Sequence, residues 1–232
     1  MSNNTGLEKY FSYSFSLDCL IFGYHEGKIH VLLIKRDMEP FKSLWAIPGD
    51  LVNPDEDLPV AAERILFDLT SLKNIDLHQS QTFGKPNRHP QGRVITCAYF
   101  ALVKVDELDA KASSWANEVK WVPIKEVEDL AFDHNEILNS TCEILKQKLS
   151  TEPVCFDLLP EKFTLNEMQQ LYEYAFCLDM DKANFRKKIK HLPLVDLKEK
   201  QKNVKHRPAR LFQFDTEKYQ DMIENDQYTF KM

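Results

Sequence analysis

The sequence of 232 residues lacks any run approaching the ~18 consecutive apolar residues that a membrane-spanning helix requires. Its opening, MSNNTGLEKY, also lacks the basic and apolar regions of a secretory signal peptide. We therefore expect a cytoplasmic protein that does not bind a membrane. Repeats and low-complexity tracts are absent too, and the apolar fraction of 43% is ordinary, so the fibrous and disordered classes are excluded.

The few cysteines do not have the pattern of a disulfide framework. The five cysteines are odd in number and widely spaced: Cys19, Cys97, Cys142, Cys155 and Cys177. This pattern excludes a disulfide scaffold and a zinc cluster. We expect reduced core residues, and we predict neither a metal site nor a cofactor.

Charge is distributed unevenly along the chain. Between positions 182 and 210, eleven Lys or Arg residues stand against Asp196 and Glu199, a local charge of +9 in a chain of net charge −6. The remainder must then carry −15. Such asymmetry predicts an acidic body joined to a nucleic-acid-binding module.

The first part of the chain has the pattern of an α/β domain. Residues 13–35 contain two apolar runs around HEGK, which predicts a hairpin with Gly27 in its turn. Apolar positions recur at helical spacing over 57–70 and 132–149, and strand patterns lie at 81–83, 93–103 and 118–122. We predict an α/β/α sandwich over residues 10–150, after a flexible N-terminus at 1–9.

The second part predicts a smaller domain over 164–232, after a proline-containing connection at 151–163. Thr164 and Glu167 have the spacing of a capping box at the start of an apolar helix face. A second helix is predicted at 182–191. Two strand-like pieces, LPLVDL and ARLFQF, then flank a basic segment.

A known catalytic signature is partly present. The stretch LWAIPGDLVNPDEDLPVAAERILFDLTSL resembles the Nudix box, G-x5-E-x7-R-E-U-x-E-E-x-G-U, in which U is aliphatic and the glutamates hold divalent metal against a pyrophosphate. One register places Glu56 at the first glutamate and Arg64 at the arginine, but only Asp68 at a metal-ligand position. The alternative register starts at Gly49 and puts Phe67 at such a position. Neither restores the cluster, so we predict no catalytic residues and no hydrolase activity.

The resemblance extends beyond the box. TFGKPNRHPQGRVITCAYFALV is similar to a segment of Nudix-related transcriptional regulators of the NrtR type, with His89 and Gln91 where Asp and Arg are usual. FTLNEMQQLYEYAF, DKANFRKKI and HRPARLFQF resemble the winged helix-turn-helix half of that family. The resemblance implies an α/β fold in which a Nudix-like α/β/α sandwich precedes a C-terminal winged helix-turn-helix domain.

Members of this family sense ADP-ribose-type ligands or, in Bacteroidetes, L-arabinose. The eroded metal helix and the altered residues 89 and 91 favour a neutral sugar, so we predict an arabinose-responsive regulator of sugar utilisation, closest to the Bacteroidetes group. The predicted effector residues are Lys35, Trp45, Asp50, Glu56, Arg88, His89 and Arg93. Each has a structural alternative: Trp45 as core, Lys35 as a solvated strand end, Glu56 as a helix cap, with Arg64 as an ion-pair partner.

The basic segment predicts contacts to operator DNA. Phe185, Ile189 and Leu192 share one side of the helix, which leaves a basic side for the major groove. The predicted DNA-binding residues are Lys182, Asn184, Arg186, Lys187, Lys190, Lys202, Lys205, Arg207 and Arg210. The alternative interpretation is a solvated charged face.

We therefore predict a homodimeric repressor that binds a palindromic operator and is released by L-arabinose. Two alternatives stay open. One is a Nudix-type protein that senses ADP-ribose, or hydrolyses it as an active pyrophosphohydrolase. The other is an adaptor whose basic tail contacts RNA or an acidic protein.

Overall fold

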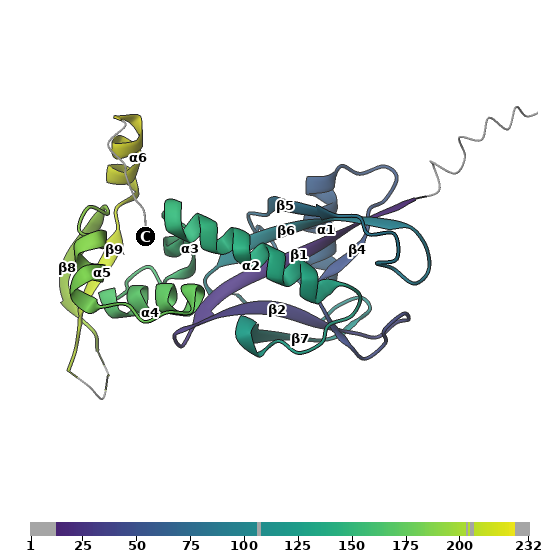
Figure 1. Cartoon of the computed structure of the whole chain (residues 1–232), viewed down its shortest axis with the longest axis horizontal. Coiled ribbons are helices and arrows are strands. Elements are labelled where there is room, and N and C mark those ends of the chain that lie inside the picture. Colours follow the sequence, from purple (N-terminus) through teal and green to yellow (C-terminus); the bar gives the residue numbers. More distant parts are fainter. Residues whose placement is uncertain (1–12, 106–107, 203, 205–206, 226–232) are drawn as a thin grey trace, which may run out of the picture. The chain divides into compact units, whose positions relative to one another are not determined.

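A computed structural model describes residues 13–105, 108–202, 204 and 207–225. These residues form two compact units (Figure 1). The first contains most of the chain up to Cys142. The second contains Glu143 onward together with Gly23–Ile29 and the end of a strand that begins at Val94. The predicted flexible segment at 1–9 lies outside the described residues.

The first unit is built on a seven-stranded sheet. Its strands are β1 (Ser14–His25), β2 (Lys28–Arg36), β3 (Trp45–Ala46), β4 (Gly49–Leu51), β5 (His78–Phe83), β6 (Val94–Val103) and β7 (Ala116–Pro123). The order is β3-β2-β1-β6-β5, while β4 pairs with β1 and β7 with β2. The central β1 is buried from Leu17 through Phe22, as its apolar sequence requires. The predicted hairpin is confirmed, and Glu26 and Gly27 both have positive φ, as a type I′ turn requires.

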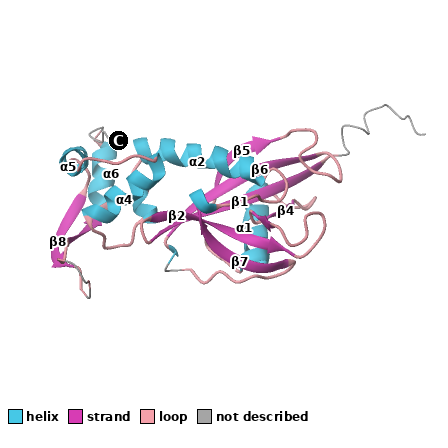
Figure 2. Cartoon of the chain, turned by 60° about the horizontal axis from the view of Figure 1, so that its bottom comes forward, coloured by secondary structure: helices cyan, strands magenta, loops and turns pink. Residues whose placement is uncertain are grey.

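Helices cover both faces of this sheet, which confirms the predicted sandwich. The beginning of α2 (His134–Thr151) lies on one face and α1 (Leu58–Thr70) on the other (Figures 1 and 2). Asp57 caps α1 by accepting a hydrogen bond from the Leu58 N–H, and Pro59 falls in the first turn, where its missing N–H has no helical partner to lose. The apolar stripe Ala61, Ala62, Ile65, Leu66 and Leu69 is buried.

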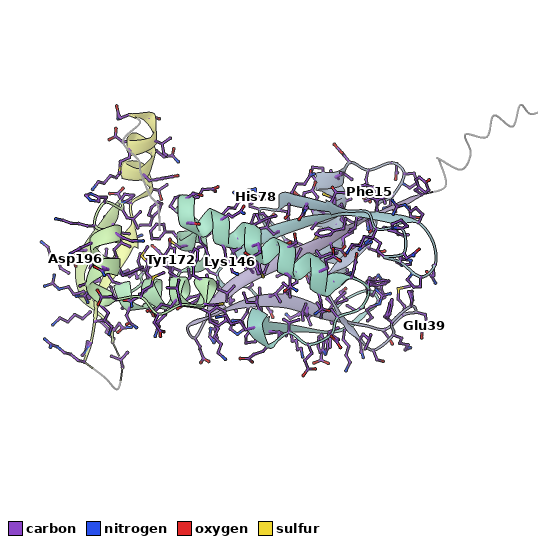
Figure 3. All side chains as sticks on the ribbon, in the orientation of Figure 1. Phe15, Glu39, His78, Lys146, Tyr172 and Asp196 are labelled. Atoms are coloured by element: carbon purple, nitrogen blue, oxygen red, sulfur yellow. The ribbon has the colours of Figure 1, made fainter. Side chains whose placement is uncertain are left out.

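The second unit contains α3 (Cys155–Leu158), α4 (Leu165–Phe176), α5 (Lys182–Ile189), the hairpin of β8 (Leu194–Lys200) and β9 (Arg210–Phe214), and α6 (Thr216–Glu224). Thr164 and Glu167 form the predicted capping box, with both reciprocal hydrogen bonds present. Tyr172 and Phe185 pack in the interior of this unit, where Tyr172 is labelled in Figure 3. Helix α5 ends at Ile189, short of the predicted His191.

One helix of the second unit, α3, carries no clear signal in the sequence. Helix α3 has only four residues, too few to display a period, and it lies within the predicted connection. Cys155, Leu158 and Leu159 there are buried, so this segment is packed structure. Phe163 adds an antiparallel bridge to Phe212, which extends the β8–β9 hairpin into a small winged sheet.

Candidate functional site

A cavity of about 430 Å³ opens beside the central strand of the first unit. Its walls come from segments far apart in the sequence: the start of β1, the end of β2 and the loop after it, β4, the loop before β6, and the start of α2. Figure 3 shows Glu39, one lining residue, on the loop after β2. Its volume lies in the usual range for small-molecule sites.

Asp18 on β1 provides a buried carboxylate to this cavity, with only 4% of its surface exposed. Its Oδ2 accepts a hydrogen bond from Thr96 Oγ1 at 2.7 Å. Two weaker contacts complete its surroundings: His134 Nε2 lies 3.4 Å from Oδ1, and Arg88 Nη2 lies 3.6 Å from Oδ2. A carboxylate has about four acceptor positions. Asp18 therefore retains capacity for a ligand.

The two neighbours of Asp18 are themselves fixed. Arg88 donates from Nε and Nη2 to both oxygens of Asp133, at 2.9 and 2.7 Å. His134 Nδ1 accepts from the Ile47 N–H at 3.0 Å, so the neutral ring carries its hydrogen on Nε2, which faces Asp18. Burial lowers the pKa of His134, and the nearby Asp18 and Asp133 only partly oppose this effect. The neutral form of His134 is therefore the form present in the folded protein.

The cavity is also lined by the aromatic side chains of Trp115, Phe132 and His89. The guanidinium of Arg36 lies 4.9 Å from the ring centres of both Trp115 and Phe132, and Arg36 Nε donates to the Pro40 carbonyl. The His89 ring stacks on Phe132, with 5.0 Å between ring centres. Phe132 has a φ of 56°, a rare backbone conformation for a bulky residue and one that clusters at functional sites.

Four of the predicted effector residues line this cavity: Asp50, Arg88, His89 and Arg93. Asp50 accepts a hydrogen bond from Trp115 Nε1 at 3.0 Å, and Arg93 Nη1 donates to the Gly84 carbonyl at 2.6 Å. Burial, followed by the positive charges of Arg88 and Arg36, lowers the pKa of His89. The structure thus brings together residues that are far apart in the sequence.

The other three predicted residues, Lys35, Trp45 and Glu56, are not among the lining residues. Lys35 is paired in register with Trp45 and lies 3.8 Å from Glu118. Because side chains alternate along a strand, Lys35 faces away from the side used by Arg36. Glu56 accepts hydrogen bonds from Arg64 and from the Asn53 N–H, so Arg64 is the ion-pair partner considered for it, whereas the cap of α1 is Asp57 and not Glu56.

Sequence reasoning missed several lining residues, namely Asp18, Arg36, Trp115, Phe132 and His134. One of them had a usable signal, since Asp18 is a lone acid inside the apolar run of β1. Arg36 is the last residue of β2, whereas Trp115, Phe132 and His134 enter from loops and from a helix start, where no periodicity marks their direction.

The helix that resembles the Nudix box has few free carboxylates. Asp68 lies 3.6 Å from Arg64, while Ile65 and Leu69 are buried. Within the described part of the chain, no group of three or more His, Cys, Asp or Glu side chains is placed to hold a metal ion.

The second unit presents an exposed basic helix. Asp181 caps α5 by accepting from the Asn184 N–H, and Phe185 and Ile189 are buried as predicted. The predicted DNA-contacting residues of this segment are all exposed: Lys182, Asn184, Arg186, Lys187 and Lys190. Burial of one side therefore leaves a cationic side open to solvent.

The hairpin after α5 carries the remaining predicted contacts. Lys202 and Arg207 are exposed, and Lys205 lies outside the described residues. Arg210 Nη1 forms an ion pair with Asp196 Oδ2 at 2.9 Å across the hairpin, on which Asp196 is labelled in Figure 3.

Among the described residues, no helix is long and apolar enough to span a membrane.

A Nudix-like sandwich joined to a winged helix that carries an exposed basic helix is the architecture of a DNA-binding transcriptional regulator. Comparison with known proteins agrees with this class. Residues 15–140 match the NUDIX domain family, and residues 155–214 match the NrtR DNA-binding winged helix domain. The chain belongs to the Nudix-related transcriptional regulators of the NrtR type.

Individual relatives span both units. The chain is 31% identical over 208 residues to the ADPR responsive transcriptional repressor NtrR of Acinetobacter baylyi, covering 88% of this chain and 83% of the relative. The structure of Shewanella oneidensis NrtR complexed with a 27mer DNA is 28% identical, with a TM-score of 0.70 over 87% of this chain and 93% of that one. The NUDIX domain of the same protein, complexed with ADP ribose, is 29% identical with a TM-score of 0.55, over 62% of this chain and 99% of that one.

Proposed function

We propose that this protein is a transcriptional repressor whose cavity beside β1 binds a small-molecule effector that changes operator affinity. The observation that carries this proposal is the presence, in one chain, of that cavity and of an NrtR-type winged helix with an exposed basic α5. An effector that binds more tightly to one of two conformations of the protein would shift its population and therefore its affinity for DNA.

We propose ADP-ribose, or a related nucleotide, as the first candidate effector. The NtrR of Acinetobacter baylyi is described as ADPR responsive, and the NUDIX domain of Shewanella oneidensis NrtR was solved with ADP ribose. These relatives favour ADP-ribose over the L-arabinose predicted from the sequence, and they give no support for a place in the Bacteroidetes arabinose group.

Hydrolysis of that nucleotide is not part of the proposal. In the box helix, Glu56 is bound by Arg64, Asp68 lies beside the same arginine, and Ile65 and Leu69 have no oxygen ligands. Mg²⁺ needs oxygen ligands to hold a pyrophosphate. We expect no release of AMP when the protein is incubated with ADP-ribose and Mg²⁺; release that is lost in Glu56→Gln and Asp68→Asn variants would instead establish the enzyme alternative.

The test of the proposed function is fluorescence anisotropy on the labelled promoter fragment upstream of the protein's own gene, without ligand and with ADP-ribose or L-arabinose. We expect tight binding that ADP-ribose weakens. A response to L-arabinose alone would restore the sugar-utilisation hypothesis. Failure to bind duplex DNA, with retained RNA binding, would favour the adaptor. We further propose a cytoplasmic homodimer on a palindromic site, because winged helices commonly read two symmetric half-sites.

A further inference from the structure

The cavity described above has two chemically different regions. At its inner part stands Asp18, an anionic acceptor that is 4% exposed. The cavity is also lined by three arginines, Arg36, Arg88 and Arg93, of which Arg88 reaches to 3.6 Å from Asp18, and by two further acids, Glu39 and Asp50. Any ligand must therefore present different groups to different parts of the wall.

Asp18 can be occupied only by a hydrogen-bond donor. A phosphate beside it would place two anions together at a site shielded from water, where repulsion is strong. Leaving the carboxylate without a donor would be costly as well, because a desolvated carboxylate needs hydrogen bonds to compensate for lost hydration. Thr96, His134 and Arg88 already face the carboxylate, so about one of its acceptor positions is left, and a sugar hydroxyl is a neutral donor that can fill it.

The absence of a side chain at Gly49 leaves room for the Asp18 carboxylate. An ideal Cβ on Gly49 would lie 2.2 Å from Asp18 Oδ1 and 2.7 Å from the Leu17 carbonyl, so only glycine permits the observed arrangement. Thr96 and His134 hold the carboxylate from two sides. A side chain fixed in this way recognises a ligand without loss of rotamer entropy on binding.

The three arginines that line the cavity differ in the partners that they already have. Arg88 is already paired in a bidentate manner with Asp133, and Arg36 is held between Trp115 and Phe132. Arg93 is partly exposed, its Nη1 donates to the Gly84 carbonyl, and its guanidinium lies 5.8 Å from the centre of the Tyr13 ring. Because Arg93 has no carboxylate partner among these contacts, an anionic part of a ligand fits beside it.

We infer that Asp18 is the specificity-determining residue of the effector site and that it accepts a hydrogen bond from a hydroxyl group of the ligand's terminal pentose ring. This inference rests on the proposed function. The pentose hydroxyls are the chemistry shared by ADP-ribose and L-arabinose, so the same residue serves whichever of them is the effector. ADP keeps the adenosine ribose but lacks the terminal ribose, so it should bind more weakly than ADP-ribose if the terminal ring is the one at Asp18.

The test is isothermal titration calorimetry of the full chain with ADP-ribose, ADP and L-arabinose, comparing the natural protein with Asp18→Asn. Asn cannot supply the charged acceptor, and hydrogen bonds to charged groups contribute about 1.5–3 kcal/mol, which corresponds to at least ~10-fold in affinity. We expect Asp18→Asn to lower the affinity for the pentose-bearing effector at least about 10-fold and to reduce the difference between ADP-ribose and ADP. Asp68→Asn, the same charge change outside the cavity, should leave both affinities unchanged.

Fold and function are controlled separately. DNA binding without ligand should be preserved in Asp18→Asn, because the winged helix is a different unit. If the variant does not fold, the natural protein is titrated with 2-deoxypentose and 3-deoxypentose analogues of the ligand that binds; equal affinity for these analogues would overturn the inference. Unchanged affinity in a folded Asp18→Asn variant would do the same and leave the proposed function standing. No binding of any of the three ligands by the natural protein would refute the proposed effectors themselves.

Discussion

Arg64 holds Glu56 with two of its nitrogens: Nε lies 2.8 Å from Oε2, and Nη2 donates to Oε1. These residues occupy the box positions of the arginine and of the first glutamate. A third bond, from Arg64 Nη2 to the Leu51 carbonyl at 3.0 Å, fastens the loop before α1 to the helix. These two box positions thus form an ion pair that secures a loop in this chain.

This ion pair predicts acid sensitivity. The hydrogen bond from Arg64, followed by that from the Asn53 N–H, lowers the pKa of Glu56 from 4.5 to about 2. Because the folded pKa lies below the unfolded one, the pair stabilises the fold above pH 4.5 and loses this effect as the pH falls toward 2. We expect Glu56→Gln to reduce the slope of unfolding free energy against pH in that window, measured by urea titration. The exposed Glu63→Gln is the matched control; equal slopes for the natural protein and Glu56→Gln would contradict the prediction.

His134 predicts a second pH dependence, at higher pH. Burial lowers its pKa below 6.5, so the unfolded chain binds a proton more tightly than the folded one. Stability should therefore be complete above pH 6.5 and decrease as the pH falls below it. In His134→Asn, whose amide oxygen can still accept from the Ile47 N–H, this decrease should be smaller. Thermal unfolding midpoints on either side of pH 6.5 measure the effect, with the exposed His78→Asn as control.

The exposed side of α5 predicts a salt-dependent contact to DNA. Replacement of one phosphate-contacting lysine should reduce the slope of log binding constant against log salt by about 0.9. We expect Lys187→Ala to show this change and to weaken binding similarly for different operator sequences. Lys73→Ala removes the same charge from the first unit and should leave the slope unchanged. A Lys187→Ala slope equal to that of the natural protein would mean that this face is merely solvated.

The buried side of α5 predicts a loss of stability. Phe185 is 2% exposed and packs against Tyr172 on α4. We expect Phe185→Ala to destabilise the second unit by about 3 kcal/mol, because it leaves a cavity in addition to the lost burial. DNA binding should fall with the folded fraction, and recover at lower temperature. Chemical denaturation followed by circular dichroism measures the loss; Leu178→Ala, at an exposed leucine nearby, should change stability by less than about 1 kcal/mol.

Local signals in the sequence predicted much of the fold. The apolar runs of β1 and β2, the period of α1 and the capping box of α4 are properties of neighbouring residues, and the structure has each of them. Helix α3 was missed because four residues show no period.

The site was predictable only in part, because it is assembled from distant segments. Arg88, His89 and Arg93 lie in the segment that resembles the family, and they were found through that resemblance. Phe132 and Trp115 reach the cavity through loop geometry, which no spacing rule encodes. Lys35 was assigned from its place at a strand end, but the period of two along β2 directs Arg36, not Lys35, toward the cavity.

The absence of a Cβ at Gly49 also constrains the order in which substitutions at positions 18 and 49 can occur. Position 49 cannot gain a side chain while Asp18 keeps its place, since the two would share the same volume. A shorter residue at position 18 removes the clash with the carboxylate and leaves only the close approach to the Leu17 carbonyl. A change toward another ligand would therefore require a substitution at position 18 first. The effect of a substitution at position 49 would depend on which residue is already present at position 18.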